Sequence, residues 1–499
     1  MNSGATGPFR LDEAGISRMR EVFAAADFTE AGVVRHLHSR DPVKVEAREM
    51  PRLLSMTRGG TPLDVFIRLF IMGVAVPADA ARTAVSPMAL DAWEEVGLLS
   101  AAGSSVRAPL RLVPTSHLLA AFDPSTRGTD AETRPDHVHG LGISSLNLMN
   151  ATIRRPVERT LDLGTGCGIQ GMMCAGHSRR VVSTDINLRA LNIARFNTML
   201  SGLENIEFRC GSRFEPVTGE RFDLVLMNPP FAISPDHRFL FRDGGMTGDG
   251  FVRALIGEAP AHLTEGGYCQ ITAQWAHQKG CAWQDRLKGW VEGSGCDAWV
   301  IRLTTQNPET YAANWISETE KLAPMDYAKK WDAWMAYFEA AGIEAVSTGM
   351  ITLRRRHSSD HGFWITEDAE SVGPHAGEAW HRGFLLRDFL RSTPAPEWLD
   401  LPFQISPEAR IDQSLRPSAP GWRAEKTVLR HAGGIRYAGN LDGLMIGLLG
   451  GCDGRTPLGT LVDALARDMG TERGDIAASV LDVMQHLIVR GFVVPPALI

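Results

Sequence analysis

Apolar and polar residues alternate through the middle of the chain as strands and helices that follow one another. Short apolar runs suited to buried strands lie at 159–163, 181–185, 206–210, 222–227, 267–273, 298–303 and 346–354, with helical segments between the first six. Such alternation is typical of a parallel sheet with helices on both faces. The sequence therefore predicts an α/β fold with a doubly wound, mostly parallel sheet of seven strands.

The regions on both sides of this alternation have helical patterns. Residues 11–123 carry apolar residues mainly at helix spacing. Short alternating stretches lie in the later part of this region, near 98–101 and 107–113. Near the C-terminus, three helical patterns precede a short strand at 491–494; they lie at 441–449, 458–469 and 476–490. Helices followed by small strands predict mainly helical, winged-helix-like domains at both ends.

These patterns divide the chain into four parts. We expect an N-terminal recognition domain at 1–135 that ends in a linker at 123–136, an α/β domain at 136–356, a polar connector at 357–409 and a C-terminal domain at 410–499. A tryptophan-rich helical insertion at 308–341 precedes the last strand of the α/β domain, which is expected to be an antiparallel edge strand. The insertion could cap a substrate or serve only in helix packing.

Composition narrows the class of protein. The formal net charge of -7 does not suggest a protein that coats nucleic acid through bulk electrostatics, although a local basic patch could still bind it. The seven cysteines are an odd number without paired metal spacing, which predicts free thiols in a reducing cytosol. The N-terminus lacks a signal-peptide pattern, and no apolar run is long enough to span a bilayer. We therefore expect a cytoplasmic protein without a membrane anchor.

A glycine-rich turn at 162–168 follows the first predicted strand and opens an apparent helix at 169–175. Such a turn lets a ligand approach the backbone at the carboxyl edge of the sheet. The next strand ends in Asp185, whose carboxylate can accept hydrogen bonds from both hydroxyls of a ribose. These features suit a nucleotide-like cofactor, and by themselves they would equally suit a dinucleotide.

The detailed sequence of the turn resembles the first motif of class I S-adenosylmethionine-dependent methyltransferases, which carry an acidic residue before the glycines, here Asp162. The resemblance covers residues 136–356 and implies a Rossmann-like fold that binds S-adenosylmethionine. It implies that Asp162 helps to hold the ammonium group of the cofactor or the turn, and that Asp185 holds the ribose. It also implies that three glycines leave room for the amino acid part of the cofactor: Gly164, Gly166 and Gly168.

Many members of that family have an acidic residue after the third strand that binds the adenine amino group. This chain has Gly211-Ser212-Arg213-Phe214 at that place. Ser212 is the candidate for the adenine contact, and Phe214 is a candidate for packing on the adenine ring.

The strand at 222–227 brings Asn228-Pro229-Pro230-Phe231 to the same edge of the sheet. An amide or exocyclic amine nitrogen is a weak nucleophile because its lone pair is delocalised into a π system. Hydrogen-bond acceptors that hold its N–H groups help as positive charge develops on the nitrogen. The Asn228 side-chain oxygen and the Pro229 carbonyl can supply two such acceptors, and Phe231 can stack on the planar group. Asn228, Pro229 and Phe231 are therefore the predicted catalytic residues, and Asn228 is also expected to lie beside the cofactor.

This segment resembles the signature of N-methyltransferases of the methyltransferase small domain type, which act on release-factor glutamines or on amines of RNA and DNA bases. Glutamine methylators typically have tyrosine at the last position, whereas Phe231 is similar to some RNA methylators. The resemblance implies methylation of a planar nitrogen in a macromolecule, either a protein glutamine or a nucleic-acid base.

Two alternatives stay open at this point. One is a methyltransferase of a small molecule or a peptide natural product. The other is a non-catalytic regulator that binds S-adenosylmethionine and uses winged helices on DNA, against which the intact 228–231 segment argues. No metal is predicted, because His137 and His139 have no third ligand nearby in the sequence. A glycine-rich stretch at 242–250 is either a substrate-side loop or a simple connection.

Overall fold

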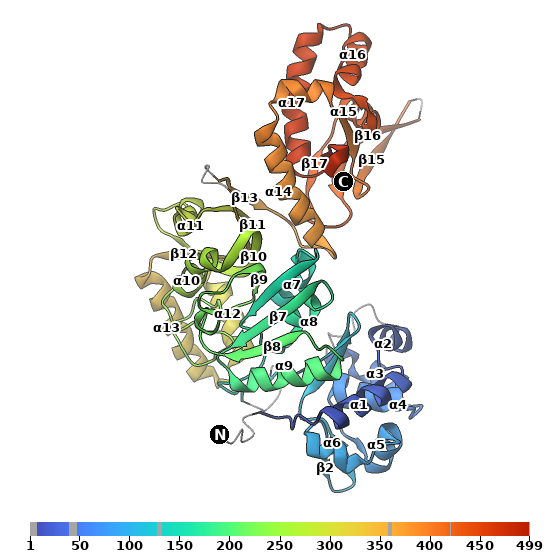
Figure 1. Cartoon of the computed structure of the whole chain (residues 1–499), viewed down its shortest axis with the longest axis vertical. Helices are drawn as coiled ribbons and strands as arrows, with labels where there is room; N and C mark the ends of the chain where they lie inside the picture. The colour runs from blue at the N-terminus through green and yellow to red at the C-terminus, as the bar shows by residue number, and fades with distance from the viewer. Residues whose placement is uncertain (1–6, 39–46, 127–131, 358–361, 420, 499) are drawn as a thin grey trace. The chain divides into compact units, whose positions relative to one another are not determined.

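The structure is a computed structural model that describes residues 7–38, 47–126, 132–357, 362–419 and 421–498 (Figure 1). The chain divides into two compact units. The first contains Met1–Met149 and Arg155–Glu367, and the second contains Asn150–Arg154 and Asp368–Ile499. Parts of the expected linker and connector, 127–131 and 358–361, lie outside the described residues.

An eight-stranded sheet forms the centre of the first unit, in the order β13-β11-β12-β10-β9-β6-β7-β8. Neighbours from β10 to β8 are parallel, while β12 pairs antiparallel with both β10 and β11. The strands are β6 (Val157–Leu163), β7 (Ser178–Asp185), β8 (Ile206–Cys210), β9 (Phe222–Met227), β10 (Leu263–Gln278), β11 (Cys296–Gln306), β12 (Ile343–Arg355) and β13 (Trp364–Asp368). The predicted large, mostly parallel α/β sheet is confirmed.

Two details of the predicted sheet are wrong. The sheet has eight strands rather than seven, because β13 joins it beside β11 from the segment that was expected to be a connector. The strand β12 is antiparallel as expected, but it lies inside the sheet rather than at its edge. Its long, mostly buried pattern fits an interior position, because it pairs along nearly its whole length on both sides.

Helices cover both faces of the sheet (Figure 1). Leu161 of β6 belongs to an apolar cluster with residues of α10 and α11. Its neighbour Asp162 points to the opposite face, where it accepts a hydrogen bond from the backbone of α8. The helices beside the sheet are α7 (Ile143–Ala151), α8 (Ile169–Cys174), α9 (Leu188–Leu200), α10 (Gly250–Glu258) and α11 (Trp283–Val291).

The tryptophan-rich insertion is helical, as predicted. It forms α12 (Pro308–Thr319) and α13 (Pro324–Ala340), which share a buried aromatic cluster. Tyr311 and Trp334 are among the fully buried members of this cluster, which also includes Ile233 from the loop after β9. The insertion therefore packs directly against the loop that follows the 228–231 segment.

The described residues of the N-terminal region of the first unit form six α-helices and small sheets. These are α1 (Glu13–Ala25), α2 (Glu30–Leu37), α3 (Met50–Met56), α4 (Pro62–Phe66), α5 (Ala78–Val85), α6 (Leu90–Val96), a sheet of β1 (Val76–Pro77), β3 (Ser105–Arg107) and β2 (Ser100–Ala102), and a hairpin of β4 (Arg111–Thr115) and β5 (Leu118–Phe122). The region packs on α9, where Phe9 stacks on Phe196 at a centroid distance of 3.8 Å. Its winged-helix assignment stays a prediction.

The second unit contains the three helices predicted near the C-terminus, α15 (Gly443–Gly450), α16 (Leu458–Met469) and α17 (Arg473–Val489), together with α14 (Ala376–Ser392). Its strands form two sheets, one of β18 (Asp453–Pro457), β14 (Pro402–Ile405) and β19 (Val493–Val494), and one of β15 (Ala409–Ser418), β16 (Gly421–His431) and β17 (Ala438–Asn440). The expectation of a mainly helical domain missed these sheets, and a winged-helix assignment stays a prediction here too. Among the described residues of the whole chain, no helix has the length and apolarity needed to cross a membrane.

Candidate active site

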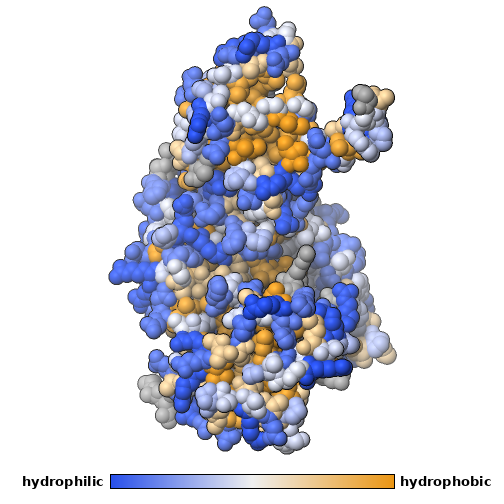
Figure 2. Space-filling view, turned by 90° about the vertical axis from the view of Figure 1, so that its right-hand side faces the viewer, coloured by the Kyte–Doolittle hydropathy of each residue, from blue (hydrophilic) through white to orange (hydrophobic). Residues whose placement is uncertain are grey.

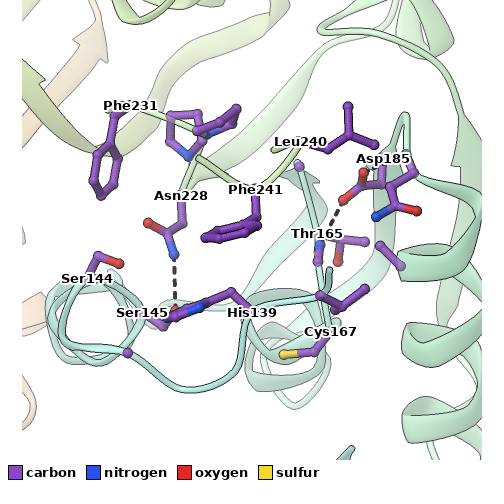
Figure 3. A pocket seen from close by; sticks show the side chains of 18 of the residues that line it. His139, Ser144, Ser145, Thr165, Cys167, Asp185, Asn228, Phe231, Leu240 and Phe241 are labelled. Atoms are coloured by element: carbon purple, nitrogen blue, oxygen red, sulfur yellow. Dashed lines mark hydrogen bonds between the residues drawn. The ribbon is translucent and has the colours of Figure 1, made fainter. Parts of the chain in front are cut away.

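A cavity of about 630 Å³ lies at the carboxyl ends of β6, β7 and β9. This volume is within the range of small-molecule sites. Figure 3 shows Phe231 and Asn228 on one side of the cavity and Thr165 and Asp185 on the other, with Phe241 between them. Of the predicted site residues, Gly164, Gly166, Asp185, Ser212, Asn228, Pro229 and Phe231 line the cavity, whereas Asp162 and Gly168 do not.

Two glycines of the turn after β6 face open space. Gly164 and Gly166 have φ angles of 73° and 55°, which place both in the left-handed region. A Cβ added at either position would meet no atom within 4 Å. Glycine is favoured there by the backbone conformation, and the space beside it belongs to the cavity. The turn is thus shaped as a cradle that a ligand can approach closely.

Gly168 has a different role. Its φ is 89°, and a Cβ there would lie 2.9 Å from the Cβ of Ala194 on α9. This glycine therefore allows the start of α8 to pack closely on α9, and it does not border the cavity.

Asp162 is buried beneath the turn. Its Oδ2 accepts hydrogen bonds from the Thr165 hydroxyl and from the Gly171 N–H, the latter at 2.9 Å. Burial raises the pKa of Asp162 to about 6. Of the two roles that the resemblance implied for Asp162, this geometry supports holding the turn.

Asp185 stands at the end of β7 and borders the cavity. Its Oδ2 accepts from the Gly166 N–H at 2.9 Å, and its Oδ1 accepts from the Asn187 N–H at 2.8 Å. Burial raises the pKa of this carboxyl. Each carboxylate oxygen can accept a further hydrogen bond, so Asp185 is fixed in place and can still bind hydroxyl groups.

Beyond β8, Ser212 borders the cavity but Phe214 does not. Phe214 is buried and stacks on His262, with ring centroids 4.5 Å apart. The expectation that Phe214 packs on a ligand in the cavity is therefore wrong, because its ring belongs to the core. An apolar wall is supplied instead by Ile186, which is 58% exposed and follows Asp185 directly.

Asn228 is held by two hydroxyl groups. Its Nδ2 donates to the Ser145 Oγ at 3.0 Å, as Figure 3 shows, and its Oδ1 accepts from the Thr272 Oγ1 at 2.6 Å. Ser145 comes from α7 and Thr272 from β10, and both are buried. The amide of Asn228 therefore has a defined orientation, and its oxygen can accept a second hydrogen bond from a ligand.

Aromatic rings surround the space next to Asn228. Phe231, Phe241 and Trp315 line it, and the His139 ring lies nearly parallel to Phe241 at a centroid distance of 5.6 Å. Burial lowers the pKa of His139 and lowers that of His137 to about 4, so both rings are neutral at pH 7. Within the described ranges, no group of three or more His, Cys, Asp or Glu side chains could hold a metal ion.

The insertion fixes the loops on this side. The Tyr311 hydroxyl accepts from the Ile233 N–H at 2.9 Å, and fully buried Arg242 donates to the Thr319 Oγ1 at 2.8 Å. Arg242 belongs to the stretch that was predicted to be a substrate-side loop or a connection, and its neighbour Phe241 lines the cavity. The insertion also contributes Trp315 and Glu318 to the lining, in addition to packing as a helical pair.

Sequence reasoning assigned no individual role to four of these residues. Ser145 and Thr272 lie in an ordinary helix and strand, and only pairing in space brings them to Asn228. Phe241 and Trp315 had weak signals, because one adjoins the Arg242 stretch and the other lies in the tryptophan-rich insertion.

Residues 141–281 match the family model described as the methyltransferase small domain. This segment is similar to that family. The matched segment contains the glycine turn, Asp185 and the 228–231 segment. Two further families, both described as domains of unknown function, match residues 25–109 and 381–495.

Three relatives illustrate the similarity of this segment to known proteins. Release factor glutamine methyltransferase of Xylella fastidiosa is 35% identical over 130 residues, which are 24% of this chain and 47% of that protein. Ribosomal protein uL3 glutamine methyltransferase of Bradyrhizobium diazoefficiens is 37% identical over 130 residues, 23% of this chain and 41% of that protein. Ribosomal RNA small subunit methyltransferase C of an Enterobacter strain is 32% identical over 136 residues, which are 27% of this chain and 36% of that protein. The chain spans less than half the length of these three curated relatives.

Proposed function

We propose that this protein transfers a methyl group from S-adenosylmethionine to a planar nitrogen of a macromolecule. The observation that carries the proposal is the single cavity that brings the glycine turn and Asn228 to one edge of the sheet. One side of this cavity suits a nucleoside with an amino acid tail, and the other suits a flat acceptor group.

The donor side would bind the cofactor, which supplies an electrophilic methyl group when bound. Gly164 and Gly166 leave an open cradle beside the backbone for its amino acid part. Asp185 would accept hydrogen bonds from the ribose hydroxyls. Ile186 and Ser212 would lie beside the adenine, the first through apolar contact and the second through its hydroxyl.

The acceptor side would orient the nitrogen. The Asn228 Oδ1 and the Pro229 carbonyl would accept hydrogen bonds from the two N–H groups of an amide or amine. Those bonds strengthen as positive charge develops on the nitrogen, which lowers the barrier. Phe231 would stack on the planar group, and the fixed geometry would supply the proximity that the displacement needs.

The charges around the cavity favour a protein amide as the acceptor. Glu318 borders it, and Arg213, the one arginine in its described lining, donates to the Glu258 Oε1 at 2.6 Å. A carboxylate at the border and no unpaired cation in that lining would not attract a phosphate backbone. The relatives support the same class, since two of the three act on glutamine, as their names state.

A nucleic-acid base is the second candidate. Three aromatic side chains around the acceptor space could hold a base by stacking: Phe231, Phe241 and Trp315. One relative is named for methylation of ribosomal RNA. Because the named targets of the three relatives are a release factor, a ribosomal protein and ribosomal RNA, we propose that the acceptor belongs to the translation apparatus.

A labelling experiment tests the proposal. Purified protein is incubated with methyl-tritiated S-adenosylmethionine and a cell extract, and the products are digested with protease or with nuclease. We expect protease-sensitive label that is absent with Asn228→Ala. Nuclease-sensitive label would select the base instead, and label in a low-mass fraction would select a small-molecule or peptide acceptor. Cofactor binding without transfer to any fraction would favour the non-catalytic regulator.

A further inference from the structure

A two-stranded arm projects from the second unit. Strands β15 and β16 form an antiparallel hairpin that stands clear of the helices of that unit (Figures 1 and 2). All described residues from Arg410 to Lys426 are exposed. Residues in a hairpin of this length usually gain stability from packing, so an exposed arm suggests a surface with a partner.

One face of the arm is basic. Residues 409–431 contain five basic and two acidic side chains, a net charge of +3, in a chain whose net charge is -7. Arg416 lies directly opposite Arg423, and Ser414 lies opposite Lys426. Directly opposite residues share a face, as do alternate residues along a strand, so the three cations lie on one face.

Two of these cations, Arg416 and Arg423, lie directly opposite each other. Like charges directly opposite in a sheet are destabilising, and within the described residues no ion pair includes Arg416, Arg423 or Lys426. The ion pair of Arg430 with Asp412, at 2.6 Å, lies nearer the base of the arm. An anionic partner would relieve the repulsion between Arg416 and Arg423.

The opposite face is apolar and carries an aromatic ring near the tip. Trp422 is 70% exposed and pairs with Pro417, while Leu415 is 52% exposed. An exposed indole is suited to stacking on an unpaired base of a strand whose phosphates bind the guanidinium groups of the other face. Paired bases in a duplex do not expose a face for such stacking.

We propose that this arm binds single-stranded RNA through Arg416, Arg423 and Lys426, with Trp422 stacked on a base. The choice of RNA rests on the proposed function, whose acceptor belongs to the translation apparatus. Binding by the arm itself does not depend on methyl transfer. The acidic net charge of the chain is no obstacle, because the basic face is local.

Fluorescence anisotropy of the full-length protein with an unstructured, mixed-sequence 16-nucleotide RNA tests this proposal. Three phosphate contacts predict that log affinity falls with log salt concentration with a slope of about -2. Replacing Arg416, Arg423 and Lys426 together by glutamine should weaken binding at least about tenfold and bring the slope close to zero. Trp422→Ala should weaken binding about tenfold and leave the slope unchanged.

A matched triple variant controls for net charge. Arg455→Gln, Arg467→Gln and Arg473→Gln remove the same charge from exposed arginines outside the arm and should leave RNA affinity unchanged. Absent RNA binding, equal weakening in both triple variants, or equal affinity for DNA of the same sequence would overturn the proposal. So would tighter binding to vesicles of phosphatidylcholine and phosphatidylserine than to RNA.

Binding of S-adenosylmethionine, measured in every variant, confirms folding. If the wild-type protein transfers methyl groups but does not bind RNA, only the proposal that the arm binds RNA is contradicted. If it binds RNA but transfers no methyl group, only the proposed function is contradicted.

Discussion

On the glycine-turn side of the cavity, the chain holds its ligand-facing groups through backbone contacts, whereas on the Asn228 side it holds them through side chains. Asp185 is fixed by the N–H groups of Gly166 and Asn187, both close to β6 or β7 in the fold. Asn228 is fixed by the hydroxyls of Ser145 and Thr272, which lie in a helix and a strand far apart in the sequence. Backbone-built sites tolerate changes in distant side chains, and side-chain-built sites do not. We therefore expect the two sides to fail in different ways when substituted.

The largest expected effect is on the acceptor side. Asn228→Ala removes the side-chain acceptor for the substrate N–H groups and should lower the rate of methyl transfer about 10²–10³-fold. The rate is measured in single turnovers as the transfer of tritium from methyl-tritiated S-adenosylmethionine to the acceptor. A rate within a factor of a few of the wild type would contradict the proposed role of Asn228.

Next in size is an effect on the donor side. Asp185→Ala should weaken S-adenosylmethionine binding about 10–100-fold, because hydrogen bonds from the ribose to a charged group are lost. Asp223→Ala is a matched control, since Asp223 also accepts from two backbone N–H groups, those of Glu158 and Arg159, but does not border the cavity. Calorimetric titration of both variants checks the prediction, and equal affinities in the two would argue against the ribose assignment.

A smaller effect should follow from loosening Asn228 without removing it. Thr272→Val replaces a hydroxyl by a methyl group and should lower turnover about tenfold with unchanged cofactor affinity, because the amide loses its orienting partner. Thr272→Ser should retain turnover. Thr352→Val is the control, because this hydroxyl is also buried in the sheet but has no hydrogen-bond partner among the described residues. If both valine variants lose turnover alike, the effect comes from packing and not from orientation.

The smallest effect concerns Asp162 and should appear in stability alone. Its pKa is about 6 in the folded protein and 3.8 as a free group, so the folded state holds the proton more tightly. Stability should therefore fall as the pH rises from about 4 to about 6, by on the order of 3 kcal/mol, and stay level above that range. Asp162→Asn keeps an oxygen that can accept from Thr165 and Gly171, and should remove this fall.

Urea unfolding at several pH values measures the free energy of unfolding for both proteins. The difference between their pH profiles isolates Asp162 from other titrating groups. Identical profiles would show that Asp162 does not titrate in this range.

The donor side could be predicted from the sequence because its parts are consecutive. The turn and Asp185 each follow a strand directly, so a local pattern also places them in space. The role of Gly168 could not be predicted in this way, since its closeness to Ala194 depends on how α8 packs on α9. The place of Phe214 could not be predicted either, because only the fold decides whether its ring borders the cavity or stacks on His262.

The acceptor side was predictable only at Asn228 and its neighbours. Ser145 and Thr272 belong to no recognisable motif. The position of Phe241 depends on its neighbour Arg242, which is buried and anchors the loop to α12. The interior position of β12 was missed because strand order follows from pairing between distant segments. The arm of β15 and β16 was missed because its residues are exposed, so its strands lack the apolar runs that mark buried ones.

The most direct test of the division between the two sides is the affinity of Asn228→Ala for S-adenosylmethionine, measured by calorimetric titration. We predict an affinity within about threefold of the wild type, since the groups proposed to hold the cofactor are Gly164, Gly166 and Asp185 and their partners. A loss as large as that of Asp185→Ala would contradict the account, because it would show that Asn228 binds the donor rather than the acceptor.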